Sequence, residues 1–295
     1  MSYNKSFRHL NLKYAYFLAS EISDLIVSDD SEEKLDKFLW FYAKSLEEYF
    51  MELLTDNIEK LVTPSKDTVL HRFISDISNM AINFDVYWFK DEFYNEDPEE
   101  IENYIYERFV QILEYYGVSI PGYPECIREI CKNYNEENPA EYEIRIKGAV
   151  DGIVTYFERI EDSIVNEVFY LLFNDKLLLL RFNLLLSEYV RKIDCKRYPS
   201  IFDKSNNIVR CQYLPEWIKK AIYFRDNGTC QHCHNDLSGF IRINEDRELQ
   251  FDHIIPIEKG GSNDPTNFQL LCRDCNLKKH GEIIIPKYYF AIKVA

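Results

Sequence analysis

The chain has 295 residues, of which 46% are hydrophobic and 15% aromatic. These values exclude a largely disordered chain and predict an ordered globular protein with room for two domains. The N-terminus has no basic stretch followed by an apolar one. The most apolar run, Leu177–Leu186, is too short to cross a bilayer and contains Arg181. The sequence therefore predicts a soluble, cytoplasmic protein with no membrane contact, in which this run is a buried helix.

The net charge of −15 is unevenly distributed along the chain. Residues 210–295 hold 12 Lys and Arg against 11 Asp and Glu, a net charge of +1, which leaves −16 on residues 1–209. An acidic surface repels a phosphate backbone, so the N-terminal part is not expected to track nucleic acid by itself. We expect it instead to bind a protein partner, to self-associate or to regulate the rest of the chain.

Residues 1–197 carry a mostly helical pattern. Helix-start signals stand at Asp30, at Asp97-Pro98 and at Asn138-Pro139, and the last of these helical stretches is expected to break near Asn174-Asp175. After the second signal, four apolar residues are predicted to share one helix face: Ile101, Ile105, Phe109 and Ile112. We predict that this region forms an acidic helical domain.

A linker is predicted at 198–213, where the helical periodicity lapses and turn formers gather. Residues 214–295 then form the second predicted domain. A helix starts at Pro215 and ends at Asn227-Gly228, the stretches LQFDHIIPI and NFQLL have strand character, and a short helix spans about Arg273 to His280. The predicted fold class is α+β, with a helical N-terminal domain and a small C-terminal domain.

Four of the eight cysteines form two CxxC pairs, Cys230 with Cys233 and Cys272 with Cys275. A CxxC turn lets both thiolates face one ion, and two such turns complete a tetrahedral Zn²⁺ site with no open position. A closed site of this kind has a structural role. His232 and His234 stand beside the first pair and could replace a cysteine, but four cysteines already suffice.

The stretch FDHIIPIEKGGSNDPTNFQLLCRDCNLKKH contains Asp-His, Pro, Gly-Gly, Asn and Cys-x-x-Cys-Asn in that order. It closely resembles the signature of HNH (ββα-metal) endonucleases of the four-cysteine zinc type. With the helix before it, the resemblance covers 214–282 and says nothing of residues 1–200. It implies a metal-dependent enzyme that hydrolyses DNA to 5′-phosphate and 3′-hydroxyl ends, by analogy in a restriction or antiviral defence system.

The resemblance also implies a role for each matched residue. His253 is the general base that takes a proton from the attacking water. Asp252 and Asn276 offer oxygen ligands to a catalytic Mg²⁺ or Mn²⁺ ion. Asn267 pins the loop between the strands and helps to hold the histidine. His280, four residues after Asn276 on the predicted helix, is either a third ligand of that ion or a histidine facing solvent or phosphate.

Lys278 and Lys279 are predicted to contact phosphate groups of the nucleic acid. A second interpretation is a non-catalytic, zinc-stabilised module that binds nucleic acid or protein and is attached to a helical interaction domain. We favour the active nuclease because Asp252, His253 and Asn276 are all present. The expected partners are thus DNA, as the substrate, and a protein or a second copy bound through the acidic domain.

Overall fold

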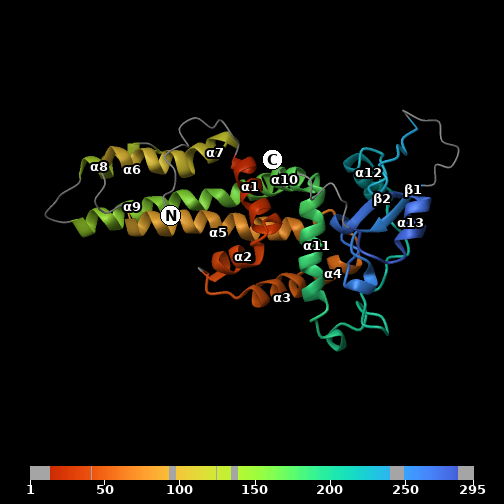
Figure 1. The fold of residues 1–295 in the computed structure, drawn as a ribbon. Helices are drawn as coiled ribbons and strands as arrows, with labels where there is room; N and C mark the ends of the chain where they lie inside the picture. The colour runs from red at the N-terminus through yellow and green to blue at the C-terminus, as the bar shows by residue number, and fades with distance from the viewer. Residues whose placement is uncertain are drawn as a thin grey trace. The chain divides into compact units, whose positions relative to one another are not determined.

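The computed structural model describes residues 14–40, 42–92, 98–123, 125–133, 139–239 and 249–284. The described chain is helical for most of its length and ends in a two-stranded sheet and a short helix (Figure 1). This arrangement confirms the predicted α+β class. The chain divides into two compact units, the first made of Met1–Ser20 and Ile74–Val168 and the second of Glu21–Phe73 and Phe169–Ala295. No helix among the described residues is long and apolar enough to cross a membrane.

The described part of the first unit is made of helices. Three helices run through a unit boundary: α1 (Tyr14–Val27), α5 (Val69–Glu92) and α10 (Glu161–Phe173). The others are α6 (Pro98–Ile105), the π-helix η3 (Tyr106–Val110), α7 (Gln111–Tyr115), α8 (Glu125–Lys132), α9 (Pro139–Val154) and the 3-10 helix η4 (Thr155–Arg159). Helices α6 and α9 begin at the two prolines where the sequence predicts a helix start.

The π-helix η3 changes which side chains of the first unit face its core. Ile101, Ile105 and Phe109 are buried, as predicted from helical spacing. Val110 and Leu113 are buried as well, whereas the predicted Ile112 is only half-buried. A π-turn takes one residue more than an α-turn, so the apolar face moves on by one position. The prediction for Ile112 is therefore wrong for a local geometric reason.

The second unit contains the remaining helices. They are α2 (Ser31–Trp40), α3 (Leu46–Asp56), α4 (Ile58–Val62), α11 (Lys176–Val190), the 3-10 helix η5 (Cys195–Arg197) and α12 (Glu216–Arg225). Helix α11 holds the apolar run Leu177–Leu186 and is buried among its neighbours, as predicted. Asp175 caps its N-terminus, because the side chain accepts hydrogen bonds of 3.0 Å from the amides of Leu177 and Leu178.

A small ββα arrangement closes the chain. Strands β1 (Leu249–His253) and β2 (Phe268–Cys272) pair antiparallel, and helix α13 (Arg273–Lys279) follows directly and packs against both. Two 3-10 turns, η6 (Ile257–Lys259) and η7 (Pro265–Asn267), lie in the loop between the strands. Helix α12 packs against β2 and helps to enclose an apolar core. Both strands overlap the stretches LQFDHIIPI and NFQLL that have strand character, but β1 ends at His253, before the end of the first stretch.

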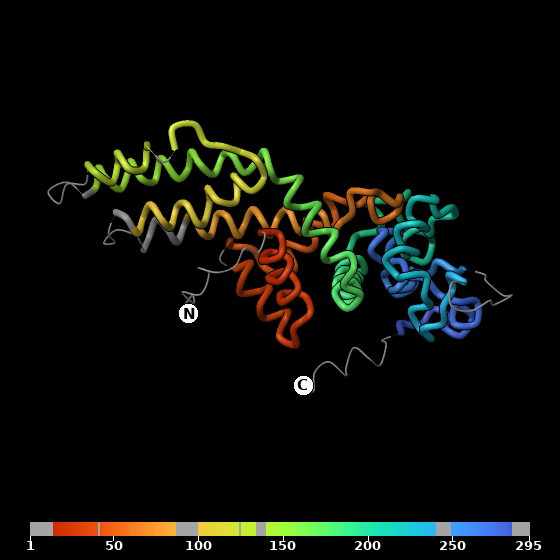
Figure 2. The backbone as a smooth tube through the Cα atoms, turned by 90° about the horizontal axis from the view of Figure 1, so that it is seen from above, coloured from red at the N-terminus to blue at the C-terminus, as the bar shows by residue number. Residues whose placement is uncertain are grey.

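Two helices that precede the predicted linker in the sequence pack on the loop between β1 and β2, within the second unit. Helices α4 and α11 lie beside the C-terminal segment in both views (Figures 1 and 2). A Cβ atom on Gly260, which has a φ of +84°, would be 2.6 Å from the carbonyl oxygen of Ser187 in α11. Side-chain Nδ2 of Asn183 in α11 donates to the carbonyl oxygen of Thr266 at 3.2 Å.

The predicted linker at 198–213 lies within this second unit. Phe202 and Ile208 form an isolated antiparallel β-bridge there, and both side chains are buried. The segment is thus ordered by its own short-range pairing as well as by its neighbours. The expectation that residues 214–295 fold independently of residues 1–197 stays a prediction.

Candidate active site and zinc centre

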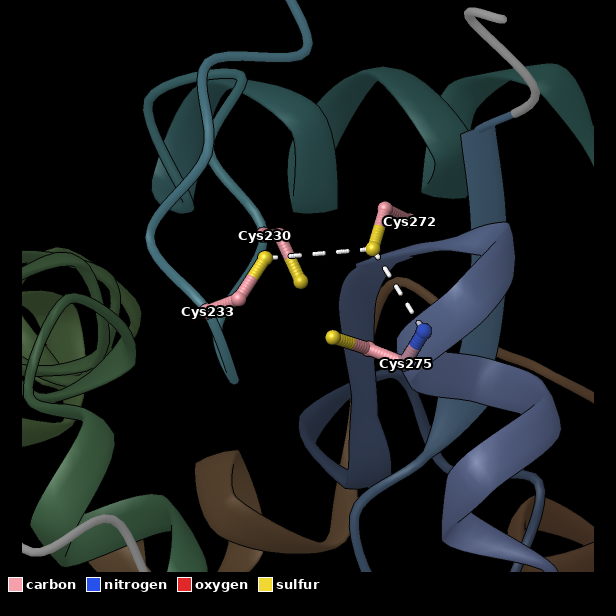
Figure 3. Close-up of side chains that lie close together, drawn as sticks. All are labelled: Cys230, Cys233, Cys272 and Cys275. Carbon is pink, nitrogen blue, oxygen red and sulfur yellow. Dashed lines mark hydrogen bonds between the residues drawn. The ribbon is translucent and has the colours of Figure 1, made fainter.

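The two CxxC pairs come together at one point of the second unit (Figure 3). Cys230 and Cys233 lie in the loop after α12, Cys272 ends β2, and Cys275 is in α13. Their four Sγ atoms all lie within 4.8 Å of one another, and those of Cys233 and Cys272 are 3.8 Å apart. Tetrahedral Zn²⁺ with bonds of about 2.3 Å places its sulfur ligands roughly 3.8 Å from each other. The geometry therefore fits a zinc ion.

The chemistry of these thiols also fits a cation. Burial, together with the neighbouring sulfurs of Cys272, Cys233 and Cys230, raises the pKa of the Cys275 thiol. Four thiolates this close together need a positive charge between them. His232 and His234 are exposed and stand outside the cluster, so cysteine sulfur is the donor that the structure gathers here.

A pocket of about 340 Å³ opens between the end of β1 and the end of α13. Asp252, His253, Lys279 and His280 all line it, so the structure brings together four residues that the sequence singles out. Arg210 and Glu258 line it too, and the sequence did not mark either of them. In the sheet register Asp252 is opposite Gln269 and His253 is opposite Phe268.

His253 is almost completely enclosed, with 3% of its surface exposed. Its ring packs on that of Phe268 with a centroid separation of 4.4 Å, and Nε2 is 3.2 Å from Oδ1 of Asn263. The pKa of His253 is lowered to about 4, first because burial disfavours the imidazolium and next because Arg210 is positively charged. The imidazole is therefore neutral at pH 7 and able to accept a proton.

Asp252 is paired with two cations. Lys279 Nζ lies 2.7 Å from Asp252 Oδ2, and Arg210 Nη2 lies 3.8 Å from Oδ1. The same Nζ donates to the carbonyl oxygen of His253 at 2.7 Å, and the Lys279 side chain is only 3% exposed. Lys279 thus faces inward, onto the carboxylate, instead of outward where the predicted phosphate contact would lie. Lys278 is exposed.

A model of the family described as HNH endonuclease matches residues 230–282. This segment is an HNH domain. The match takes in both cysteine pairs, both strands and α13, which is the part of the chain where the sequence resembles that family. An HNH domain has a nuclease-type fold and implies a nucleic-acid substrate. No curated protein and no solved structure matches the chain.

The loop of the HNH domain is tied together by Asn267, which is fully buried. Its Oδ1 accepts from the amide of Ile255 at 2.8 Å, and its Nδ2 donates to the carbonyl oxygens of Ile255 and Ser262 at 3.0 and 2.9 Å. The turn is so tight that a Cβ on Gly261 would be 1.9 Å from the Ile255 carbonyl oxygen. The loop residue that hydrogen-bonds to the His253 ring is Asn263, which sequence reasoning missed.

His280 does not belong to the last helix of the HNH domain. Helix α13 ends at Lys279, and His280 is its C-cap with a left-handed φ of +44°. The predicted helical step from Asn276 to His280 is therefore wrong, because the chain leaves the helix before His280. His280 is exposed and reaches the pocket by this turn, whereas Asn276 is half-buried and is not among the pocket-lining residues. Metal binding by these two residues stays a prediction.

The pocket offers few protein ligands for a catalytic ion. Among the described residues, the cysteine cluster is the one place where three or more His, Cys, Asp or Glu donors gather. In the pocket, Asp252 and Glu258 supply carboxylates, and His253 and His280 supply imidazoles. This donor set fits a hard cation such as Mg²⁺, which retains several water ligands and needs only one or two protein oxygens. It does not fit an ion that needs a complete protein cage.

Proposed function

We propose that this chain is a metal-dependent endonuclease that hydrolyses DNA phosphodiester bonds in the pocket of its HNH domain. The observation that carries the proposal is the buried, neutral His253 beside Asp252 at the end of β1. A water-activating base has to be unprotonated at working pH, and an imidazole with a lowered pKa meets that requirement. The family match to residues 230–282 supports the same reaction class.

In the proposed mechanism His253 accepts a proton from a water molecule as the water oxygen attacks the phosphorus atom. Asp252, with Asn276 or His280, would hold a Mg²⁺ or Mn²⁺ ion, which when bound neutralises phosphate charge and stabilises the leaving 3′ oxygen. Arg210, whose side chain is 60% exposed beside Asp252, and exposed Lys278 would contact the phosphate backbone. The products would carry 5′-phosphate and 3′-hydroxyl ends.

The zinc ion would have a structural task. It would fasten the loop after α12 to the end of β2 and to α13, which are the three elements that supply the cysteines. Asn276 and Lys279 follow the last cysteine on α13, so the zinc site also fixes where this helix begins relative to Asp252. The zinc ligands have no place in the proton transfer.

The acidic helical region is proposed to bind a protein partner or to self-associate, and to direct the nuclease in a restriction or antiviral defence system. The support for a protein partner is the net charge of −16 on residues 1–209, which disfavours a phosphate backbone. The support for a defence role is analogy with systems that use HNH effectors.

A second candidate function is a zinc-stabilised binding module without catalysis. One contact favours it: Lys279 Nζ occupies Asp252 Oδ2, the carboxylate oxygen that a metal ion would need. In that case Lys279 would be a permanent counter-ion, and the pocket would bind no divalent metal. The two candidates therefore differ in one measurable property, the affinity of the pocket for a divalent cation.

Replacing Lys279 with methionine tests this difference. We expect Lys279→Met to tighten Mn²⁺ binding about tenfold, because the Lys279 ammonium no longer competes with Mn²⁺ for the Asp252 carboxylate. A tenfold change in affinity corresponds to roughly 1.4 kcal/mol of binding free energy. Lys278→Met is the matched control and should leave the Mn²⁺ affinity unchanged, since Lys278 is exposed. Electron paramagnetic resonance of free Mn²⁺ measures the Mn²⁺ affinity of each variant. Absence of Mn²⁺ binding in both variants and in the original chain would favour the module.

The lowered pKa of His253 predicts an unusual pH dependence. An ordinary histidine with a pKa of about 6.5 is mostly protonated at pH 5.5 and would lose most of its activity as a base there. With a pKa of about 4, His253 stays neutral at pH 5.5, so its capacity to accept a proton is lost only as the pH falls further toward 4. Single-turnover cleavage between pH 5 and 8 measures this, and a loss centred near pH 6.5 would contradict the buried base.

The substrate class is tested with DNA and RNA of the same sequence. Purified, zinc-loaded protein should cleave the DNA in Mg²⁺ or Mn²⁺ and should stop when EDTA removes these ions. Brief EDTA treatment followed by readdition of Mn²⁺ should restore cleavage if the zinc site stays filled. Cleavage of RNA alone would overturn the DNA assignment while leaving the phosphodiester chemistry in place.

A further inference from the structure

Asn263 lies in the loop between β1 and β2, and its side chain is fully buried. It is not among the residues that the sequence marked for the site. Its amide group makes four polar contacts, three with backbone atoms and one with the imidazole of His253. So many contacts on one buried amide determine how the group is oriented, and this orientation has a chemical consequence for His253.

The three backbone contacts fix which end of the amide is oxygen. Nδ2 of Asn263 donates to the carbonyl oxygens of Val62 and Val209, at 3.0 and 2.8 Å. Oδ1 accepts from the backbone N–H of Cys211 at 3.1 Å. In the reversed orientation the oxygen would face two carbonyl oxygens and the amino group would face an N–H donor. That arrangement would lose all three hydrogen bonds in a buried place.

The orientation of Asn263 decides the protonation of the His253 ring. Nε2 of His253 faces Oδ1 of Asn263 at 3.2 Å, and an amide oxygen can only accept. Nε2 must therefore carry the hydrogen. A neutral imidazole has one N–H, so Nδ1 is left with a lone pair. We propose that Asn263 is the positioning residue that holds His253 as the Nε2–H tautomer, so that Nδ1 is the proton-accepting atom of the endonuclease; this assignment of the base rests on the proposed function.

Asn263 also ties this base to helix α4. Its backbone N–H donates to the carbonyl oxygen of Leu61 at 2.8 Å, and Nδ2 bonds to that of Val62, the last residue of α4. The last carbonyls of a helix have no partner within the helix, so Asn263 satisfies two of them. The next residue, Asp264, accepts from the N–H of Val69 at the first turn of α5, at 2.9 Å. Two consecutive loop residues thus bond to the end of one helix and the start of the next.

This arrangement makes the catalytic base depend on the helical part of the second unit. A displacement of the end of α4 would pull on the Asn263 amide, and a turn of the amide would remove the acceptor that selects the Nε2–H tautomer. A partner or signal that shifts α4 would thereby change the proton-accepting atom without touching the pocket. The helical part of the second unit and the HNH domain therefore share hydrogen bonds at Asn263, the residue that contacts the base.

The test uses the full chain with Asn263→Ala and with Asn183→Ala as the matched control. Asn183 is also a buried asparagine that joins a helix to this loop, through Thr266, and it has no hydrogen bond to His253. Histidine nitrogen NMR on ¹⁵N-labelled protein, without DNA or metal, reports which ring nitrogen is protonated. The original chain and Asn183→Ala should both show His253 as the Nε2–H tautomer. Asn263→Ala should show a mixture or the other tautomer.

Cleavage provides the second measurement. At saturating DNA we expect Asn263→Ala to lower the rate constant on the order of 100-fold, because a histidine base in the wrong tautomer loses several orders of magnitude in rate. Asn183→Ala should lower it far less at equal thermal stability. An Nδ1–H tautomer of His253 in the original chain would overturn the proposal. An Asn263→Ala variant that keeps the Nε2–H tautomer and cleaves DNA as fast as Asn183→Ala would overturn it as well.

Two precautions keep the outcomes separate. If Asn263→Ala fails to fold, Asn263→Asp takes its place in the test. The aspartate retains an oxygen that accepts from Nε2 of His253 but loses the N–H donors to the carbonyl oxygens of Val62 and Val209. His253 should keep the Nε2–H tautomer in this variant. Loss of that tautomer in folded Asn263→Asp would count against the proposal. The NMR measurement requires no catalysis, so a correct tautomer in a chain that cuts nothing would reject the proposed function and leave the tautomer assignment standing.

Discussion

Replacing His253 with alanine lowers DNA cleavage by about 10²- to 10⁴-fold, which is the usual contribution of a general base. The side chain is buried against Phe268, so its removal also lowers stability, both by leaving a cavity and by removing one of the two hydrogen bonds that Asn263 Oδ1 accepts. Single-turnover rates should therefore be measured together with zinc content and thermal unfolding. A variant that remains folded and zinc-loaded but does not cut supports His253 as the base.

His280→Ala is the control for this experiment. His280 lines the same pocket but is exposed at the end of α13, so its loss should leave stability unchanged. If His280 is a metal ligand, His280→Ala should need more Mn²⁺ for half-maximal cleavage and should recover at high Mn²⁺. If it faces solvent, the Mn²⁺ requirement should not change. A His253→Ala protein that cuts within a few-fold of the original rate would contradict the proposed mechanism.

Replacing Cys272 with serine should abolish zinc binding and unfold or loosen the HNH domain. Structural Zn²⁺ sites bind with about 10–16 kcal/mol, and this energy is coupled to folding. Cys272 joins the end of β2 to the loop that holds Cys230 and Cys233. Its loss would therefore free β2, the strand that carries Phe268, on which the His253 ring packs. Metal analysis and thermal unfolding of the full chain measure the two effects.

Cys126→Ser is the matched control, because Cys126 is an exposed thiol outside the cluster. It should retain zinc and melt as the original chain does. We further expect the loosening in Cys272→Ser to reach α11, since Asn183 of α11 bonds to the loop that leads into β2. Loss of zinc with an unchanged melting profile would contradict a structural role for the four cysteines.

Local signals account for what the sequence predicts well. The two CxxC pairs are short motifs whose meaning depends on a few adjacent residues, and the helix starts at Pro98 and Pro139 follow from the fixed φ of proline. The strands around Asp252 and Gln269 lie in the two stretches that have strand character. In each case the information lies within a few positions of the residue concerned, which is why the sequence alone suffices.

Non-local contacts and helix ends account for what the sequence could not predict. Asn263 is held by carbonyl oxygens of Val62 and Val209, and backbone atoms of distant residues leave no pattern in the side chains. Lys279 turns inward to the carboxylate of Asp252 and the carbonyl oxygen of His253, which are 27 and 26 residues away in the sequence. His280 and Gly281 both adopt positive φ. The glycine after His280 is a signal for the end of a helix, and it could have corrected the prediction that His280 continues the helix face.

The measurement that tests the central claim most directly is the conversion of supercoiled plasmid by the purified, zinc-loaded full chain in Mn²⁺, beside folded His253→Ala. We expect nicked or linear plasmid with the original chain and neither product with the variant or in EDTA. Equal cutting by both proteins would contradict it by removing the role of His253. A folded, zinc-loaded chain that neither cuts the plasmid nor binds Mn²⁺ would contradict the nuclease function and favour a binding module.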